Sequence, residues 1–273
     1  GHEGYGVVTH VGSAVKGLKV GDKAGVGWIR DACGGCSKCG EGMENLCQAG
    51  YQGTFLSSNA GPWGKKPFNE HGCFSKVMRI KEKFAYFVPE NLPPEVACPL
   101  MCAGGTLFEP IKTWVRPGMT VGIGSFGGLG TLGLQLSKKM GAKVTVFTRG
   151  TAKKEAALKI GAEAFVDYTN EAEMKAAEGS IDVFIDTCPA NAAGDLEKRM
   201  GLLKIDGSYV RVGIPSGATH DFSYQFIPLI FTGKKIAGSI VCGSARQNEM
   251  VELVSKNKEE FCGTGAWTAS TVM

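Results

Sequence analysis

The chain has 273 residues, a length that accommodates two domains or one large domain, each with its own apolar core. Hydrophobic residues make up 43% of it and charged residues 21%, as in an ordinary globular protein, and the net charge of +4 is small and spread along the chain. This composition argues against a nucleic-acid partner, and no apolar run reaches the ~20 residues that would span a membrane.

The ten cysteines are better explained by metal binding than by disulfides. Disulfide frameworks are typical of much smaller secreted chains, and metal binding accounts for about half of these cysteines. We therefore expect a reducing, cytoplasmic compartment.

Residues 1–105 are rich in turns and contain only short extended pieces, among them Gly6–Val8 and Phe74–Ile80. From Leu107 onward the pattern changes to alternating strands and helices. This change predicts two domains of different architecture, with the boundary near residue 105.

Four cysteines in the first region have the spacing C-x2-C-x2-C-x7-C, at Cys33, Cys36, Cys39 and Cys47. Tetrahedral zinc needs four converging soft ligands, and each C-x2-C turn supplies a convergent pair. Four thiolates leave no open position, so we predict a structural and not a catalytic zinc. An iron–sulfur cluster is the alternative, because it uses similar ligands and partly overlapping spacings.

Six short β-branched segments, each bounded by Gly, Asp or Asn, alternate with helical segments in the second region. This alternation predicts a parallel sheet covered by helices on both faces, as in a dinucleotide-binding domain. One of the helices is predicted from Leu129 to Met140, closed by Gly141. The predicted strands are Val121–Ser125, Val144–Thr148, Ala164–Tyr168, Ile181–Thr187, Ser208–Gly213 and Ile236–Cys242.

A glycine-rich turn between the first of these strands and its helix is the candidate phosphate-binding site. Two registers match the dinucleotide fingerprint. Gly122, Gly124 and Gly127 fit it literally, whereas the register Ser125, Gly127 and Gly130 places the last glycine better at the helix start and is the one we favour. The predicted cofactor-binding residues of this turn are Ser125, Phe126, Gly127, Gly128, Leu129 and Gly130.

At the end of the second strand, an NAD-binding domain usually carries an acid that binds the ribose 2′-hydroxyl. This chain has Thr148-Arg149-Gly150 there, followed by Lys153. Arg149 and Lys153 could neutralise a 2′-phosphate, although basic residues at the start of a helix can also simply face solvent. The missing acid favours NADP(H) over NAD(H).

These motifs, in this order, resemble the zinc-containing medium-chain alcohol dehydrogenases, particularly their cinnamyl alcohol dehydrogenase-like branch. The resemblance covers the chain to about Leu253. It rests on Gly1-His2-Glu3, Val20-Gly21-Asp22-Lys23, the four-cysteine lobe, the Pro99–Thr106 segment, Arg116-Pro117-Gly118-Met119, the Ser125–Gly130 turn and Gly238-Ser239-Ile240.

The resemblance implies an α/β fold in which a Rossmann-type, doubly wound parallel sheet is joined to an incomplete GroES-like, β-rich catalytic domain with a zinc lobe. The implied domains are 1–105 (catalytic, with the lobe), 106–242 (dinucleotide-binding) and 243–273, a C-terminal tail in which the helical pattern weakens after Glu252. In the family, a further zinc-binding cysteine and the proton relay lie upstream of the Gly-His-Glu motif, and the chain returns to the catalytic domain after Leu253. The chain is therefore expected to be truncated at both ends.

His2 and Cys102 match two ligands of the family's catalytic zinc, and Glu3 matches a carboxylate that can enter the shell of this metal. The resemblance thus makes His2, Glu3 and Cys102 the implied catalytic and metal-binding residues. Further positions implied to line the cofactor are Thr106, Thr187, Gly213, Ser239, Ile240 and Val241.

The implied function is a zinc-dependent alcohol dehydrogenase or aldehyde reductase that transfers a hydride between a primary alcohol or aldehyde and NADP(H). A homodimer paired through the edge of the dinucleotide-binding sheet is the expected assembly. One alternative is a truncated, catalytically impaired protein that binds a dinucleotide and is held together by zinc. Another is a zinc-independent quinone or enoyl reductase, against which the cysteine lobe and the His2/Cys102 pair argue.

Overall fold

The computed structural model describes residues 1–55, 72–188, 195–214 and 224–262, which form two compact units. Among these residues, the first unit contains Gly1–Phe108 and the chain from Val241 onward, and the second contains Glu109–Ile240. The described part of the predicted tail therefore belongs to the first unit and does not stand apart, while its residues from 263 onward lie outside the described ranges.

The second unit is built on a parallel six-stranded sheet in the order β11-β10-β9-β6-β7-β8. All six strands predicted from the sequence are present, and the order reverses between β6 and β9, where doubly wound sheets bind their ligands. The strands are β6 (Thr120–Gly124), β7 (Lys143–Thr148), β8 (Ala164–Asp167), β9 (Ile181–Asp186), β10 (Leu203–Arg211) and β11 (Lys235–Gly238).

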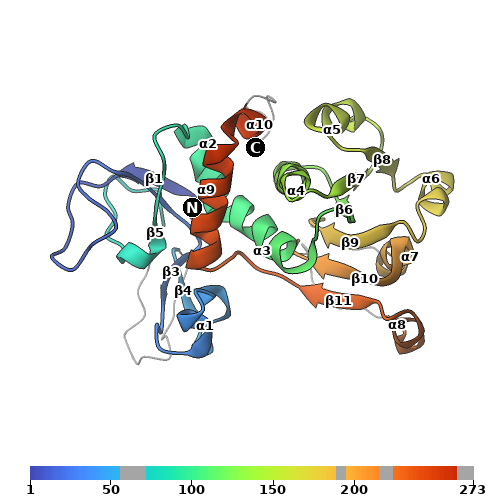
Figure 1. The fold of residues 1–273 in the computed structure, drawn as a ribbon, viewed down its shortest axis with the longest axis horizontal. Coiled ribbons are helices and arrows are strands. Elements are labelled where there is room, and N and C mark those ends of the chain that lie inside the picture. The colour runs from blue at the N-terminus through green and yellow to red at the C-terminus, as the bar shows by residue number, and fades with distance from the viewer. Residues whose placement is uncertain (56–71, 189–194, 215–223, 263–273) are drawn as a thin grey trace. The chain divides into compact units, whose positions relative to one another are not determined.

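Helices lie on both sides of this sheet, with α4 on one side and α6 and α7 on the other (Figure 1). The predicted helix after the glycine turn is confirmed as α4, and Gly141 follows it with a φ of 81°, the left-handed conformation that favours glycine at a helix end. The helices are α4 (Gly128–Lys139), α5 (Lys154–Ile160), α6 (Glu171–Ala176), α7 (Asp195–Leu202) and α8 (Phe226–Thr232).

The first unit contains a three-stranded antiparallel sheet of β1 (Gly4–Val7), β2 (Lys23–Val26) and β5 (Ala85–Phe87), and a two-stranded sheet of β3 (Ile29–Ala32) and β4 (Tyr51–Gly53). Phe74–Ile80, predicted to be extended, forms no strand, because none of these residues pairs with a sheet. The helical segments are α1 (Ser37–Gly40), η1 (Glu44–Leu46), η2 (Glu82–Phe84), α2 (Pro94–Pro99), η3 (Leu100–Gly104) and the start of α3 (Gly105–Trp114), whose residues from Glu109 belong to the second unit.

Two further helices, α9 (Ser244–Lys256) and α10 (Lys258–Cys262), continue past the point where the sequence pattern weakens. They remain helical because Met250, Val251, Val254 and Phe261 are buried. Packing within the first unit therefore compensates for weak periodicity after Glu252.

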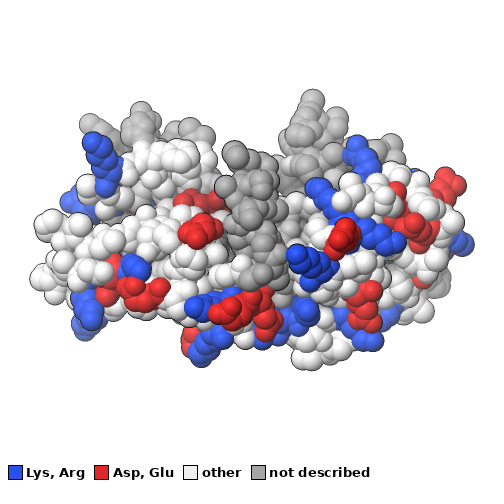
Figure 2. Space-filling view, turned by 90° about the horizontal axis from the view of Figure 1, so that it is seen from above, with Lys and Arg blue, Asp and Glu red and all other residues white. Residues whose placement is uncertain are grey.

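In the described part of the chain, every helix is too short or too polar to cross a membrane. On the face shown in Figure 2, basic and acidic side chains are interspersed, and neither sign forms a continuous patch.

Candidate metal and cofactor sites

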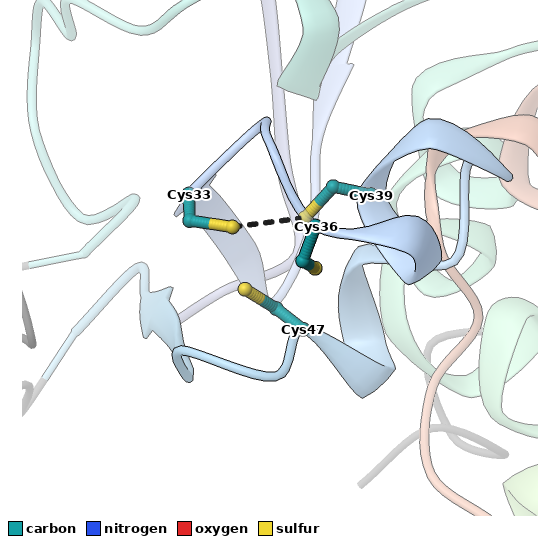
Figure 3. A group of neighbouring side chains, drawn as sticks. All are labelled: Cys33, Cys36, Cys39 and Cys47. Atoms are coloured by element: carbon teal, nitrogen blue, oxygen red, sulfur yellow. Dashed lines mark hydrogen bonds between the residues drawn. The ribbon is translucent and has the colours of Figure 1, made fainter.

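The four predicted lobe cysteines converge on one point (Figure 3). Their sulfur atoms all lie within 4.8 Å of one another, and the Sγ atoms of Cys33 and Cys39 are 3.8 Å apart. Four sulfurs bound at about 2.3 Å to one ion would be separated by about 3.8 Å in a regular tetrahedron. The thiols therefore fit a tetrahedral zinc ion.

Backbone N–H groups surround these thiols and favour their ionised form. Hydrogen bonds from Gly35 and Cys36 lower the pKa of Cys33, and those from Cys39 and Gln48 lower the pKa of Cys36 to about 6. Burial instead raises the pKa of Cys39 to about 12. Thiolate is the form that binds metal, so a cation at this point would offset the cost of ionising the buried sulfur.

Glu44 is a buried acid of the lobe that no sequence motif indicates. Its side chain is 1% exposed and pairs with Lys83 Nζ at 2.6 Å. The backbone N–H and hydroxyl of Ser244 donate to it at 2.7 and 3.0 Å. Burial alone would raise the pKa of Glu44, but the hydrogen bonds from Lys83 and Ser244 outweigh it and lower that pKa. This carboxylate thus joins the lobe to the first residue of α9.

A second candidate metal site lies where His2 meets η3. The Nε2 atom of His2 is 2.8 Å from the Sγ atom of Cys102. The His2 ring stacks on Phe55 with centroids 5.3 Å apart and meets the edge of Trp28 at 5.0 Å. The aromatic rings fix the imidazole orientation and give the pair an apolar surrounding.

Burial governs the ionisation of this pair. It lowers the pKa of His2 and, together with the charge of Glu3, raises the pKa of Cys102 to about 12. Burial also raises the pKa of Glu3, against a hydrogen bond from the Ala103 backbone N–H. A metal bound here would have to displace the thiol proton of Cys102.

Among the residues that the structure describes, the lobe cysteines are the one group of three or more His, Cys, Asp or Glu side chains with mutually close ligand atoms. The structure thus brings together His2 and Cys102 but does not add Glu3 as a third close ligand. The soft thiol and the neutral imidazole suit zinc, and the role of Glu3 remains a prediction.

The glycine turn follows β6 directly. Gly122 and Gly124 lie inside the strand, where an added Cβ would meet Phe184 at 2.7 and 2.8 Å, so their missing side chains serve packing. At Gly130, by contrast, a Cβ would lie 2.2 Å from the Ser125 carbonyl oxygen, and Ser125 itself has a φ of 73°. These positions favour the register Ser125, Gly127 and Gly130.

The basic residues after β7 border this turn. Lys153 Nζ donates to the Phe126 carbonyl at 2.8 Å, and a hydrogen bond to Tyr168 raises the pKa of Arg149. Asp167, which no sequence motif indicates, also belongs to this region: its Oδ1 atom accepts a hydrogen bond from the Gly150 N–H at 3.0 Å. That oxygen also accepts from Thr169, so the turn already occupies it.

A cavity of about 240 Å³ opens beside the turn, at the carboxyl ends of β6 to β9. Its described lining is mixed. The apolar side chains are Phe147, Met174, Phe184 and Leu202, and the polar or charged ones include Ser125, Tyr168, Glu171, Asp195, Lys198 and Arg199. A cavity with apolar and polar lining, placed at the carboxyl ends of the strands where the strand order reverses, is the setting in which doubly wound sheets bind a nucleotide.

Comparison with known proteins identifies the family. Residues 128–256 match the model described as zinc-binding dehydrogenase, and residues 1–90 match the alcohol dehydrogenase GroES-like domain. The chain is 39% identical over 263 residues to cinnamyl alcohol dehydrogenase 7 of Arabidopsis thaliana, covering 94% of this chain and 70% of the relative. The chain belongs to the zinc-binding alcohol dehydrogenase family.

The fold of this dehydrogenase is similar to the solved structures of other alcohol dehydrogenases. A cinnamyl alcohol dehydrogenase of Sorghum bicolor matches with a TM-score of 0.85 and 34% identity, over 94% of this chain and 71% of that one. A cinnamyl alcohol dehydrogenase of Helicobacter pylori, complexed with NADP(H), matches with a TM-score of 0.83 and 29% identity, over 99% and 78%. The dehydrogenase is therefore an oxidoreductase with a Rossmann-type domain and a GroES-like domain.

Three further residues predicted to line the cofactor, Thr148, Thr187 and Gly213, lie at or just after the ends of strands in the second unit. The Thr187 hydroxyl donates to the Gly124 carbonyl at 2.7 Å, which ties β9 to β6. Thr148 is buried at the end of β7, and Gly213 lies against the Cys188 backbone, where an added Cβ would be 2.4 Å from its carbonyl oxygen. Thr148, Thr187 and Gly213 therefore have structural roles at the carboxyl ends of the strands.

Thr106 hydrogen-bonds Cys102, which opposes the rise in the pKa of that thiol. Ser239 donates its backbone N–H to Arg211, and Ile240 is partly exposed. Val241 is buried in a core with Cys39 and Cys47, so its side chain packs against the lobe cysteines. The predicted cofactor role of Val241 therefore falls to its backbone.

Proposed function

We propose that this dehydrogenase interconverts primary alcohols and aldehydes with NADP(H), using His2 and Cys102 as ligands of a catalytic zinc and the four lobe cysteines as ligands of a structural one. The observation that carries the catalytic part is the 2.8 Å contact between His2 Nε2 and Cys102 Sγ. When bound, zinc supplies Lewis acidity to the substrate oxygen, and NADP(H) supplies or accepts the hydride.

The chain's own residues orient and shield this site. Stacking on Phe55 and the edge of Trp28 hold the His2 ring so that Nε2 faces the Cys102 thiol. Burial keeps His2 neutral at physiological pH by lowering its pKa, and a neutral imidazole is the form that binds metal. The same apolar surrounding strengthens electrostatic interactions with a bound substrate oxygen.

The cavity beside the glycine turn suits the adenosine part of the cofactor, and Arg149 and Lys153 are the bases we assign to its 2′-phosphate. Arg149 hydrogen-bonds Tyr168, which lines this cavity, so a phosphate beside Tyr168 would receive a charge-assisted hydrogen bond from the guanidinium. The complex of the Helicobacter pylori enzyme with NADP(H) supports this assignment.

Titration with NADPH and NADH, followed by nicotinamide fluorescence, tests the cofactor assignment. We expect a preference of about tenfold or more for NADPH, because one charge-assisted hydrogen bond changes affinity by roughly that factor. Arg149→Ala should remove most of the preference, whereas Lys159→Ala, which removes an equal charge at the far end of α5, should keep it. Equal affinities in the unmodified chain would refute NADP(H) selectivity.

Steady-state turnover with a panel of aliphatic and aromatic primary alcohols tests the reaction itself. NADPH binding without any turnover would identify a dinucleotide-binding protein held together by zinc.

We also propose that the dehydrogenase forms a homodimer through α8 and the edge strand β11. The supporting observation is that Phe226, Ile230 and Phe231 of α8 are 78%, 74% and 84% exposed next to the last strand of the sheet. An exposed edge strand beside apolar side chains can pair with its own copy across a twofold axis.

Sedimentation velocity should therefore show a dimer that Phe231→Glu converts to a monomer, because the change buries a charge at the interface. Phe74→Glu, which changes an exposed phenylalanine in the other unit, should leave the dimer intact. A monomer at all concentrations contradicts the proposal.

A further inference from the structure

Cys102 lies in the middle of η3, a single turn of π-helix between α2 and α3. The Gly105 N–H donates to the carbonyl of Leu100, five residues earlier, as well as to that of Cys102. Such turns are rare, are inserted into otherwise regular helices, and occur frequently at functional sites. This turn therefore needs stabilising contacts from elsewhere in the first unit.

Gln247 of α9 supplies such a contact. Its side chain is 1% exposed, and its amide Nε2 donates to the Leu100 carbonyl at 2.9 Å. Its Oε1 accepts from the Cys242 thiol at 3.3 Å, so both ends of the buried amide are paired. The amide thus holds the carbonyl that closes the π-turn.

The residues of the π-turn are packed tightly against Gln247 and its neighbours on α9. A Cβ added at Gly105 would lie 2.5 Å from the Gln247 Oε1 atom, and one at Gly104 would lie 2.9 Å from the Met250 sulfur. One turn before Gln247, the first residue of α9, Ser244, is held by two hydrogen bonds to the buried Glu44. The first turns of α9 are therefore held in place, and η3 packs closely against them.

The direction of the Cys102 side chain depends on this turn remaining a π-turn. Successive residues of an α-helix point about 100° apart, so removing the inserted residue would turn the side chains of η3 relative to their surroundings by a large angle. Such a rotation would move the Cys102 thiol away from His2 Nε2, which it now contacts at 2.8 Å.

We propose that Gln247 is a positioning residue that holds the π-turn and thereby keeps the Cys102 thiol against His2. Its catalytic meaning rests on the proposed function of this pair, whereas its effect on the position of the thiol does not. A polar side chain in the apolar face of α9 is the one sequence signal of this role.

The test measures the alkylation rate of Cys102 by iodoacetamide, mapped by mass spectrometry on the purified full chain. Gln247→Met keeps the length of the side chain and removes the amide. We expect this variant to react about tenfold faster at Cys102, because the thiol leaves its partly buried position and becomes accessible to the reagent. Loss of one buried hydrogen bond shifts an equilibrium by about this factor. Cys98, four residues earlier on α2, is the internal reference and should change by less than about twofold.

Two further variants keep the test decisive. Gln247→Glu keeps the shape of the side chain but removes the amide N–H that donates to the Leu100 carbonyl. This variant should therefore also expose Cys102. Val254→Ala removes a buried side chain from α9 without touching the amide, and should lower stability while leaving the ratio of the Cys102 and Cys98 rates unchanged. An unchanged or slower Cys102 rate in Gln247→Met overturns the proposal, as does an equal acceleration of both thiols.

Turnover by the unmodified chain, measured in parallel, separates this inference from the proposed function. If turnover is absent, His2 and Cys102 lose their catalytic assignment. The ratio of the two alkylation rates still decides whether Gln247 positions the thiol.

Discussion

Cys36→Ser is expected to release one tightly bound zinc ion and to lower the free energy of unfolding by several kcal/mol. The four lobe sulfurs lie within 4.8 Å of one another, and a serine hydroxyl in place of the Cys36 thiol removes one side of this shell. Metal binding to a folded site contributes directly to folding, and structural zinc in small peptides is worth ~10–16 kcal/mol at neutral pH. The lobe also shares a core with Phe84 and Val241, so its loss should loosen the first unit.

Metal analysis and urea denaturation of the purified chain measure both effects. Cys262→Ser, which changes a cysteine of α10 outside the lobe, is the matched control and should retain the metal. A purified chain without zinc, or one containing iron with the absorbance of a cluster, would show that the lobe is not a zinc site.

The lobe and the sheet could be predicted because their signals are local. The spacing of four cysteines over fifteen residues already limits which sulfurs can converge, and β-branched segments separated by helices indicate a parallel sheet without any long-range information. The end of α4 at Gly141 was likewise readable, since only glycine readily adopts the left-handed conformation found there.

The supporting contacts could not be predicted, because they join residues far apart in the chain. Glu44 and Ser244 are two hundred positions apart, and Gln247 meets Leu100 across 147. Nothing in the local pattern distinguishes a buried glutamate or glutamine from a solvated one. The same reason explains why α9 and α10 were underestimated, since their stability comes from packing and not from periodicity.

A buried carboxylate at the end of β9 illustrates the same limit. Asp186 is fully buried and accepts hydrogen bonds from Arg199 and Arg211 at 2.7 Å each and from the Tyr209 hydroxyl at 2.5 Å. It also accepts the backbone N–H of Cys188 at 3.0 Å, which shapes the chain as it leaves the sheet. One carboxylate thus compensates two guanidinium groups, of which that of Arg199 lines the proposed cofactor cavity.

Asp186→Ala should therefore destabilise the second unit by about 3–5 kcal/mol, because breaking a buried ion pair leaves the partner charge uncompensated. Asp186→Asn keeps the shape but not the charge, and should lose most of the same free energy. Asp182→Ala is the matched control on the same strand. Its carboxylate is 24% exposed, pairs with Lys204 at 2.8 Å and accepts the Thr120 backbone N–H at 2.7 Å, so its loss should cost about 1–2 kcal/mol. Urea denaturation of the three variants measures these differences. An Asp186→Asn variant as stable as the unmodified chain would show that shape and hydrogen bonding, and not charge compensation, hold Arg199 and Arg211 in place.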